Sequence, residues 1–355
     1  MKYPLKLLTA GVELTLACNC RCITCGSSAG KPRKNELKTD EMFALFTSLS
    51  NLGCKYVSFL GGEPFLRSDW WKLAGYATSL GLSVDIITSG VGFKKQYVSQ
   101  IIDAGIKSIT VSVDGNEDIH NKLRGVEGSY RMALRAIELS SKGGVKVGVT
   151  TQVNRLTLPS LEKMVGNIEI AGAIGWQLQL TLPTGNAILK KEILISCYEM
   201  KELYFVLRRL RNRKGLKPFI TDSIGYFTPD EPILRSLSNY PERFWLGCFA
   251  GLSVIGITSN GGVKGCLSLP DSFLEGNIRK ESLEKIWNDM ERFSYNRKFN
   301  PENLSGPCKA CVYGKICRGG CTATAVTFYG APNRNSHCFR LFGGDILALC
   351  EDDRR

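Results

Sequence analysis

The chain has 355 residues, of which 43% are hydrophobic and 22% charged, an ordinary globular composition with enough apolar material for two domains. Lysine and arginine outnumber aspartate and glutamate by 46 to 33, a net charge of +13 that favours acidic partners. No stretch reaches the roughly 18 apolar residues of a membrane helix, and the 14 cysteines cluster at metal-type spacings rather than as scattered disulfides, so we expect a reducing, cytoplasmic location without a membrane span.

The first predicted element is a short strand over residues 12–16, where apolar and polar residues alternate. A C-x3-C-x2-C array formed by Cys18, Cys22 and Cys25 follows it directly. A cubane iron-sulfur cluster normally takes four cysteines, so three thiolates would leave one iron free to bind something other than protein. The array therefore predicts chemistry rather than electron storage, and Cys20, which fits neither gap, is interpreted as a bystander.

Short apolar runs alternate with amphipathic segments up to about residue 185, the pattern of parallel strands joined by helices. Six β/α units are too few for a closed eight-stranded barrel, so the predicted fold class is α/β, an open partial (β/α)6 barrel. Its ligands would lie beyond the carboxyl ends of the strands. The six predicted strands cover residues 12–16, 56–60, 83–88, 108–113, 146–152 and 176–182.

Unusual loops follow several of these strands. The second strand leads into Gly61-Gly62-Glu63-Pro64, where glycines permit close approach of the backbone to a ligand, although a plain turn is the default interpretation of the tetrapeptide alone. The third and fourth strands end in small polar residues suited to bind a ribose or a carboxylate, among them Ser89, Ser112 and Asp114.

Residues 186–245 carry a weaker signal. Helical periodicity predicts one helix over residues 195–213, and the prolines that follow mark an irregular connector. We therefore divide the chain into residues 1–235, the barrel with a helical extension and connector, and residues 236–355, a domain rich in cysteine.

The second domain has its own pattern of cysteine spacings. Cys248 and Cys266 flank a predicted β-hairpin over residues 253–258 and 263–267, turned by Ser259-Asn260-Gly261-Gly262. A C-x2-C-x5-C-x3-C run from Cys308 to Cys321 follows, and then Cys338. A zinc ribbon is the structural alternative, but these seven cysteines do not divide into complete four-thiolate zinc sites.

The first array, combined with Gly61-Gly62-Glu63-Pro64 after the second strand, resembles the radical S-adenosylmethionine (SAM) superfamily, and the later cysteines resemble its SPASM domain. The resemblance implies an enzyme that reductively cleaves SAM and abstracts a hydrogen atom with the resulting 5′-deoxyadenosyl radical. It also implies the same partial barrel. The implied cofactors are SAM, one SAM-binding 4Fe-4S cluster and two auxiliary iron-sulfur clusters.

The resemblance assigns residues to these cofactors. Gly61, Gly62 and Glu63 would hold the methionine amino group of SAM, and Arg124 would lie near its carboxylate unless it is a surface loop arginine. The same site would include Ser89, Ser112 and Asp114, while Gln152, Asn154 and Gln179 would face adenosine or substrate unless they cap loops. The implied cluster ligands are Cys18, Cys22 and Cys25 for the SAM cluster, Cys308, Cys311, Cys317 and Cys338 for one auxiliary cluster, and Cys248, Cys266 and Cys321, without a fourth cysteine, for the other.

The expected reaction is less specific. Our first hypothesis is maturation of a ribosomally made precursor peptide by crosslinking or epimerisation. Because the array starts at residue 18, we expect no fused leader-recognition domain in front of it, so the peptide would need a separate recognition protein or none. A flavodoxin or ferredoxin would supply electrons. The second hypothesis is oxidative decarboxylation of a tetrapyrrole haem precursor, whose propionates would meet the basic surface. The non-enzymatic alternative is a basic iron-sulfur or zinc module that binds nucleic acid. Its weakness is that this role does not require Gly61-Gly62-Glu63-Pro64.

Overall fold

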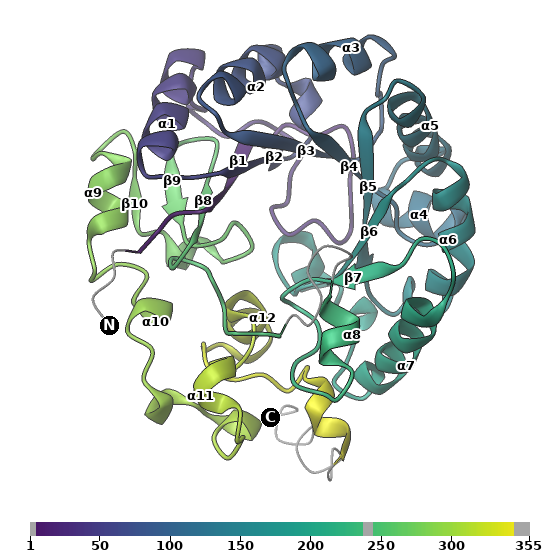
Figure 1. Ribbon diagram of the computed structural model, residues 1–355, viewed down its shortest axis with the longest axis vertical. Coiled ribbons are helices and arrows are strands. Elements are labelled where there is room, and N and C mark those ends of the chain that lie inside the picture. The colour runs from purple at the N-terminus through teal and green to yellow at the C-terminus, as the bar shows by residue number, and fades with distance from the viewer. Residues whose placement is uncertain (1–4, 237–243, 344–355) are drawn as a thin grey trace.

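The computed structural model describes residues 5–236 and 244–343, and a single ten-stranded sheet runs through it (Figure 1). The order of the strands in the sheet is β10-β9-β8-β1-β2-β3-β4-β5-β6-β7. The strands are β1 (Thr9–Thr15), β2 (Tyr56–Gly61), β3 (Ser83–Thr88), β4 (Ser108–Ser112), β5 (Lys146–Val153), β6 (Gly175–Leu180), β7 (Pro218–Ile220), β8 (Val254–Ile257), β9 (Gly262–Lys264) and β10 (Gly276–Asn277).

Strands β1 to β7 pair in parallel, and the helices between them cover the convex face of the curved sheet (Figure 1). Alternate strand residues point to the two faces, so that Phe59 stacks on Phe46 of α1 while its neighbour Ser58 faces the interior of the barrel. These helices are α1 (Thr39–Asn51), α2 (Trp70–Ser79), α3 (Gln96–Asp103), α4 (Glu117–Arg124), α5 (Ser129–Lys142), α6 (Leu161–Ile170) and α7 (Glu199–Asn212).

The six predicted strands are confirmed, each with its ends within three residues of the expected ones. The seventh parallel strand, β7, was missed. It is only three residues long and begins with Pro218, so it carries neither alternation nor a typical strand composition. It lies in the region expected to be irregular, whereas the helix expected over residues 195–213 is confirmed as α7.

The predicted hairpin of the C-terminal part is confirmed as β8 and β9, which pair antiparallel. Its position was not foreseen: β8 also pairs in parallel with β1, from Thr9 opposite Val254 to Val12 opposite Ile257. The hairpin thereby extends the barrel sheet on the side away from β7. The remaining helices are α8 (Glu231–Arg235), α9 (Leu283–Asn288), α10 (Ser294–Arg297), α11 (Gly314–Cys317) and α12 (Thr322–Tyr329).

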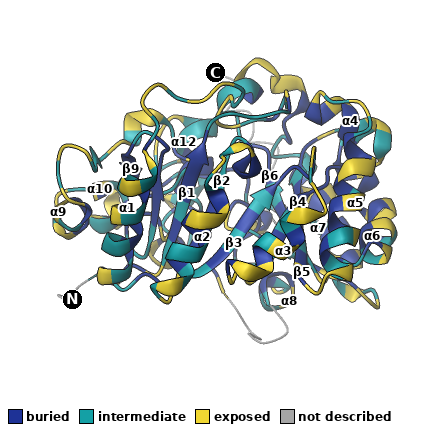
Figure 2. Cartoon of the chain, turned by 90° about the horizontal axis from the view of Figure 1, so that it is seen from above, coloured by how far each residue is buried: buried dark blue, intermediate teal, exposed yellow. Residues whose placement is uncertain are grey.

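Helices α10 to α12 lie between the two ends of the curved sheet (Figure 1). The strands and the inner faces of the helices are largely buried, and exposed residues gather on the outer faces of the helices and on loops (Figure 2). A second, smaller hydrophobic cluster joins the two parts of the chain and includes Tyr226, Trp245, Cys248 and Cys317. No helix in residues 5–236 or 244–343 has the length and apolarity needed to cross a membrane.

A buried carboxylate on β1 fastens the cysteine loop to the C-terminal hairpin. Glu13 accepts hydrogen bonds from Arg33 Nε at 2.6 Å and Arg33 Nη2 at 3.1 Å, and from Ser259 N and Oγ at 3.0 and 2.7 Å. Burial acts to raise the pKa of Glu13, but the hydrogen bonds from Arg33 and Ser259 outweigh it, so the pKa is lowered. The carboxylate therefore stabilises the fold when ionised, and this contribution is lost as the pH falls through its folded-state pKa.

We expect Glu13→Gln to lower the free energy of unfolding by about 2 kcal/mol, because Arg33 would keep a half-buried charge without its partner. Urea unfolding at neutral pH measures the change. Glu138→Gln is the matched control, since Glu138 pairs only with the exposed Lys142 on the surface of α5 and should have almost no effect. Equal stability of the two variants would contradict the role of Glu13.

Candidate active site

The loop of Cys18, Cys22 and Cys25 lies between β1 and α1 and is held by backbone hydrogen bonds from two sides. On one side, Gly62 N donates to Thr15 O and Glu63 N to Ala17 O, both at 2.8 Å. On the other side, Arg21 N donates to Arg124 O at 2.9 Å, at the end of α4. The three cysteine residues are partly buried. The ends of β2 and α4 therefore position the loop.

A third attachment comes from the segment after β6. Asn186 donates from its side-chain Nδ2 to Cys22 O at 2.8 Å and from its backbone N to Cys25 O at 2.9 Å. This residue was not singled out in the sequence, because a lone asparagine 164 positions from its partner gives no pattern to detect.

The structure explains the two glycines differently from the sequence. A Cβ atom on Gly62 would lie 2.1 Å from Ala17 O, and one on Gly61, whose φ is +137°, would lie 2.3 Å from Thr15 O. The close approach that requires glycine is thus to the backbone that leads into Cys18, whereas the sequence suggested close approach to a ligand. Their proposed contact with the methionine group of SAM stays a prediction.

Glu63 is 1% exposed, and both of its carboxylate oxygens are engaged. Oε1 accepts from Thr88 Oγ1 at 2.8 Å, and Oε2 accepts from Ser89 N and Oγ at 3.0 and 2.7 Å. Burial raises the pKa of Glu63. The structure thus brings Glu63 and Ser89 together, as predicted for one site, and shows that the carboxylate links the ends of β2 and β3 behind the cysteine loop.

Arg124 and Asp114 form a second buried group. Arg124 Nη2 lies 2.5 Å from Asp114 Oδ2, Asp114 Oδ1 accepts from Gln152 N at 2.8 Å, and Arg124 Nη1 lies 3.8 Å from Cys22 Sγ. Because Arg124 is only 9% exposed, the alternative of a surface loop arginine is wrong. Its Nε is buried without a hydrogen-bond partner among the described residues, which fits an additional acceptor such as a carboxylate or a cluster sulfide.

The side chains of the remaining predicted SAM contacts differ in their burial and in the hydrogen bonds that they already make. Ser112 is almost buried at the end of β4, and Gln179 is half-buried on the concave face of β6. Asn154 is 0% exposed, and its Oδ1 accepts from Leu156 N and Thr157 N, at 3.0 and 3.1 Å. Its side chain therefore shapes the turn after β5, as in the capping alternative, and we no longer propose it as a cofactor contact.

Cys20 is more closely involved than the spacing suggested. Its side chain is buried, and a hydrogen bond with Cys20 lowers the pKa of Cys18 and raises that of Cys22. The described structure thus gathers four thiols at this loop, of which Cys18, Cys22 and Cys25 have the predicted spacing. As three ligands suffice to hold an iron-sulfur cluster with one open iron, the donor set fits a SAM-binding cluster.

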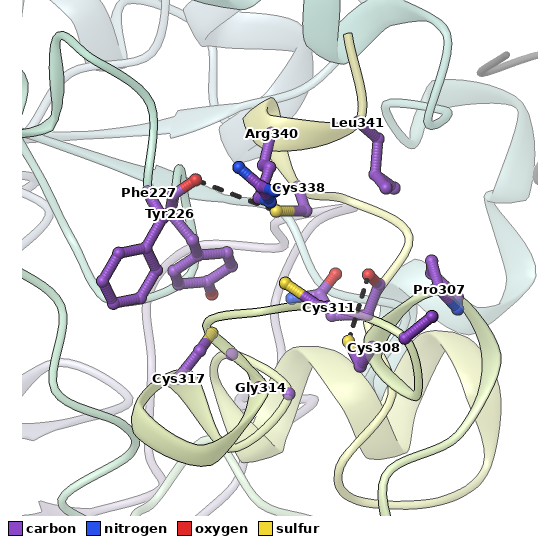
Figure 3. A pocket seen from close by; sticks show the side chains of 14 residues that line it. Tyr226, Phe227, Pro307, Cys308, Cys311, Gly314, Cys317, Cys338, Arg340 and Leu341 are labelled. Atoms are coloured by element: carbon purple, nitrogen blue, oxygen red, sulfur yellow. Dashed lines mark hydrogen bonds between the residues drawn. The ribbon is translucent and has the colours of Figure 1, made fainter. Parts of the chain in front are cut away.

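Four cysteines of the C-terminal part line one cavity of about 390 Å³ (Figure 3). These are the residues predicted as one ligand set: Cys308, Cys311, Cys317 and Cys338. Burial raises the pKa of Cys308 to about 11 and, together with charge on Cys308 and Cys311, that of Cys317 to about 12. Four thiolates here would repel one another without a cation, so this donor set fits a cationic iron core.

The predicted set of three also meets in the structure. A hydrogen bond with Cys321 lowers the pKa of Cys248, and burial followed by the charge of Cys248 raises that of Cys266. Tyr295 contributes a buried hydroxyl without a hydrogen-bond partner among the described residues; burial and then the charges of Glu275, Cys248 and Cys266 raise its pKa. Three sulfur donors beside an unsatisfied polar atom fit a cluster with one non-cysteine position.

Within the described residues, no three His, Cys, Asp or Glu side chains converge as they would on a single ion. A cubane spreads its ligands around four irons, so wider groups of cysteines are expected for clusters.

The comparisons with known proteins agree with this geometry. Residues 12–164 match the radical SAM superfamily, and residues 248–312 match the SPASM iron-sulfur cluster-binding domain. The AdoMet-dependent heme synthase of Methanosarcina barkeri is 31% identical over 327 residues, which cover 90% of this chain and 92% of that protein. The mycofactocin maturase MftC of Mycolicibacterium smegmatis is 31% identical over 328 residues, covering 90% of this chain and 79% of that protein.

The fold is also that of Streptococcus suis SuiB bound to S-adenosylmethionine, with a TM-score of 0.72 and 19% identity over 94% of this chain and 78% of that one. The protein is a radical SAM enzyme. More particularly, the chain belongs to the radical SAM superfamily and carries a SPASM domain, so its cofactors are SAM, a 4Fe-4S cluster and auxiliary iron-sulfur clusters. The non-enzymatic nucleic-acid module is thereby excluded.

Proposed function

We propose that the enzyme oxidatively decarboxylates carboxylate side chains of a tetrapyrrole. The observation that carries this proposal is the relationship to a heme synthase at 31% identity over 90% of this chain and 92% of the relative, which includes the barrel and the cysteine-rich part together. This reverses the order expected from the sequence alone, where a precursor peptide came first.

The chemistry matches what the cofactors supply. Bound SAM would supply a radical that takes a hydrogen atom from the propionate carbon next to the one that bears the carboxylate. The carbon-carbon bond to the carboxylate would then break, with loss of CO2, formation of a vinyl group and one electron left over. That electron needs an acceptor, which is the chemistry that auxiliary clusters offer.

The polar lining of the barrel interior supports a polar substrate. Side chains that alternate with the buried core residues of the strands point inward, and Ser58 donates to Asp85 at 2.7 Å among them. Burial raises the pKa of Asp85, although the hydrogen bond from Ser58 acts against the shift. Further polar side chains on this concave face are Thr110, Gln177 and Gln179.

The deciding experiment is an anaerobic reaction of the reconstituted enzyme with dithionite, SAM and an iron tetrapyrrole bearing propionates. We expect 5′-deoxyadenosine together with loss of the mass of one formic acid for each propionate converted to vinyl. Cys22→Ala protein is the control and should give neither product. SAM cleavage with an unchanged tetrapyrrole mass would contradict the proposed substrate.

A second candidate is peptide maturation, which is favoured by the 31% identity to the mycofactocin maturase MftC. Here the partner would be a precursor peptide. The same reaction mixture, made in D2O, tests it when the tetrapyrrole is replaced by a candidate precursor peptide. Crosslinking or oxidative loss changes the peptide mass, and epimerisation places solvent deuterium in the peptide. Turnover of the peptide without turnover of the tetrapyrrole would establish this candidate in place of the first.

A further inference from the structure

Tyr226 occupies an unusual position between the two auxiliary cysteine groups. It follows β7 in the chain, is 1% exposed, and has a φ of +115°. For a bulky residue this conformation is a true outlier, costing about 1–3 kcal/mol, and it persists only where the surroundings enforce it. Figure 3 shows Tyr226 beside Cys338, close to the cavity of the four-cysteine group.

The contacts of Tyr226 reach a cysteine in each group. Its hydroxyl accepts a hydrogen bond from Cys321 N at 3.0 Å, and its carbonyl oxygen lies 3.9 Å from Cys338 Sγ. The hydroxyl hydrogen is already used, because it is donated to Asp222 O at 2.5 Å. The oxygen can therefore act only as an acceptor toward Cys321, which fixes the direction of that N–H group.

The tyrosine ring is itself held in place. It packs against Gly320, where a Cβ atom would lie 2.9 Å from the ring, and its centroid lies 5.2 Å from that of Trp245. Trp245 in turn donates from Nε1 to Cys317 O at 3.1 Å. Arg235 lies over both rings, at 5.8 and 5.4 Å. One aromatic pair thus contacts the backbone of a cysteine in the three-cysteine group and of another in the four-cysteine group.

We propose that Tyr226, which lies between the two auxiliary cysteine groups, is a positioning residue whose hydroxyl sets the electronic environment of one cluster, the one held by Cys248, Cys266 and Cys321. Groups that orient the ligands of a metal centre tune its potential and affinity. Hydrogen bonds to cluster sulfurs raise the reduction potential, and Tyr226 engages the N–H of Cys321 instead. The inference concerns the clusters alone and holds for either candidate substrate.

We expect removal of this hydroxyl to change the properties of one cluster only. In Tyr226→Phe protein, Cys321 N–H loses its acceptor and becomes free to donate to a cluster sulfur. We expect the midpoint potential of the three-cysteine cluster to shift to a more positive value in an EPR-monitored redox titration, while the other two clusters keep theirs. Iron affinity at that site should fall about tenfold or more, as for other groups that orient ligands.

Tyr130→Phe is the matched control, because Tyr130 is also buried and its hydroxyl also accepts an amide hydrogen, from Asn167 at 2.9 Å, but in the barrel. It should leave all three potentials unchanged. Cys321→Ala and Cys311→Ala proteins assign the auxiliary signals to their sites. Unchanged potentials in Tyr226→Phe, or equal shifts of both auxiliary clusters, would overturn the proposal.

A second variant keeps the test decisive if Tyr226→Phe does not fold. Trp245→Phe removes the N–H that binds Cys317 O together with part of a buried indole ring, so it should shift the four-cysteine cluster more than the three-cysteine cluster. A larger shift of the three-cysteine cluster in this variant would also overturn the assignment. No substrate is needed for these titrations, so their outcome is independent of the decarboxylation proposal.

Discussion

Cys22→Ala protein should be unable to cleave SAM, whereas Cys20→Ala protein should retain the reaction. The array offers three thiolates in the expected spacing, and removal of one leaves two, too few to hold a cluster with a single open iron. Cys20 lies among the same thiols and hydrogen-bonds to them. Its replacement therefore shows whether the cluster needs the cysteines of the predicted spacing or merely any thiol in this loop. The measurement is 5′-deoxyadenosine formed with dithionite and SAM under anaerobic conditions.

The cluster itself gives an independent signal. Cys22→Ala should lose the EPR signal of the SAM-binding cluster and its change on addition of SAM, while the auxiliary signals remain. Cys20→Ala should keep both signals, with a stability loss of about 1 kcal/mol from the small cavity that it leaves. If the two variants lost SAM cleavage equally, the assignment of ligands by spacing would be wrong.

Gly62→Ala should be nearly as severe, although it adds a single methyl group. The new Cβ would lie 2.1 Å from Ala17 O, an atom of backbone that cannot move without displacing the loop that carries Cys18. We expect a loss of at least about 3 kcal/mol in unfolding free energy, at the upper end for overpacking, and failure to assemble the SAM-binding cluster. Thermal unfolding and iron content after reconstitution measure the two effects.

Gly75→Ala provides the matched control, because Gly75 lies inside α2 and a Cβ there meets nothing within 4 Å. Alanine is the better helix former, so this variant should be more stable by up to about 1 kcal/mol and should bind a full complement of iron. A Gly62→Ala protein that behaved like Gly75→Ala would show that the approach of Gly62 to Ala17 is not essential.

Most of the fold could be predicted from local sequence patterns. Residues 56–60 and 83–88 alternate between the convex helical face and the interior, so their strands were visible from composition and period alone. Strand β7 was not, because its three residues are too few to show a period and its pairing with β6 depends on contacts distant in sequence. The proposed division near residue 235 stays a prediction, as sheet pairing continues from β1 into β8.

The same contrast applies to the site. The cysteines could be sorted from spacing because each spacing is a local property of the chain. The burial of Arg124 against Asp114, the engagement of Glu63 by Ser89 and the use of Asn154 in a turn could not, since each depends on which neighbours fold back onto it. Tyr226 carried no motif at all, and only its φ and its two cysteine contacts distinguish it.

The sequence by itself therefore determined the class of chemistry, because thiolate number and spacing limit which cluster can bind, and strand periodicity limits the architecture that holds it. The tertiary structure alone decided how the three cysteine groups are supported. The reason is physical: hydrogen bonds donated by Gly62 and Arg124 or accepted by Glu13 and Tyr226 join segments far apart in the chain. The free energy of such contacts depends on burial and geometry that no local pattern encodes.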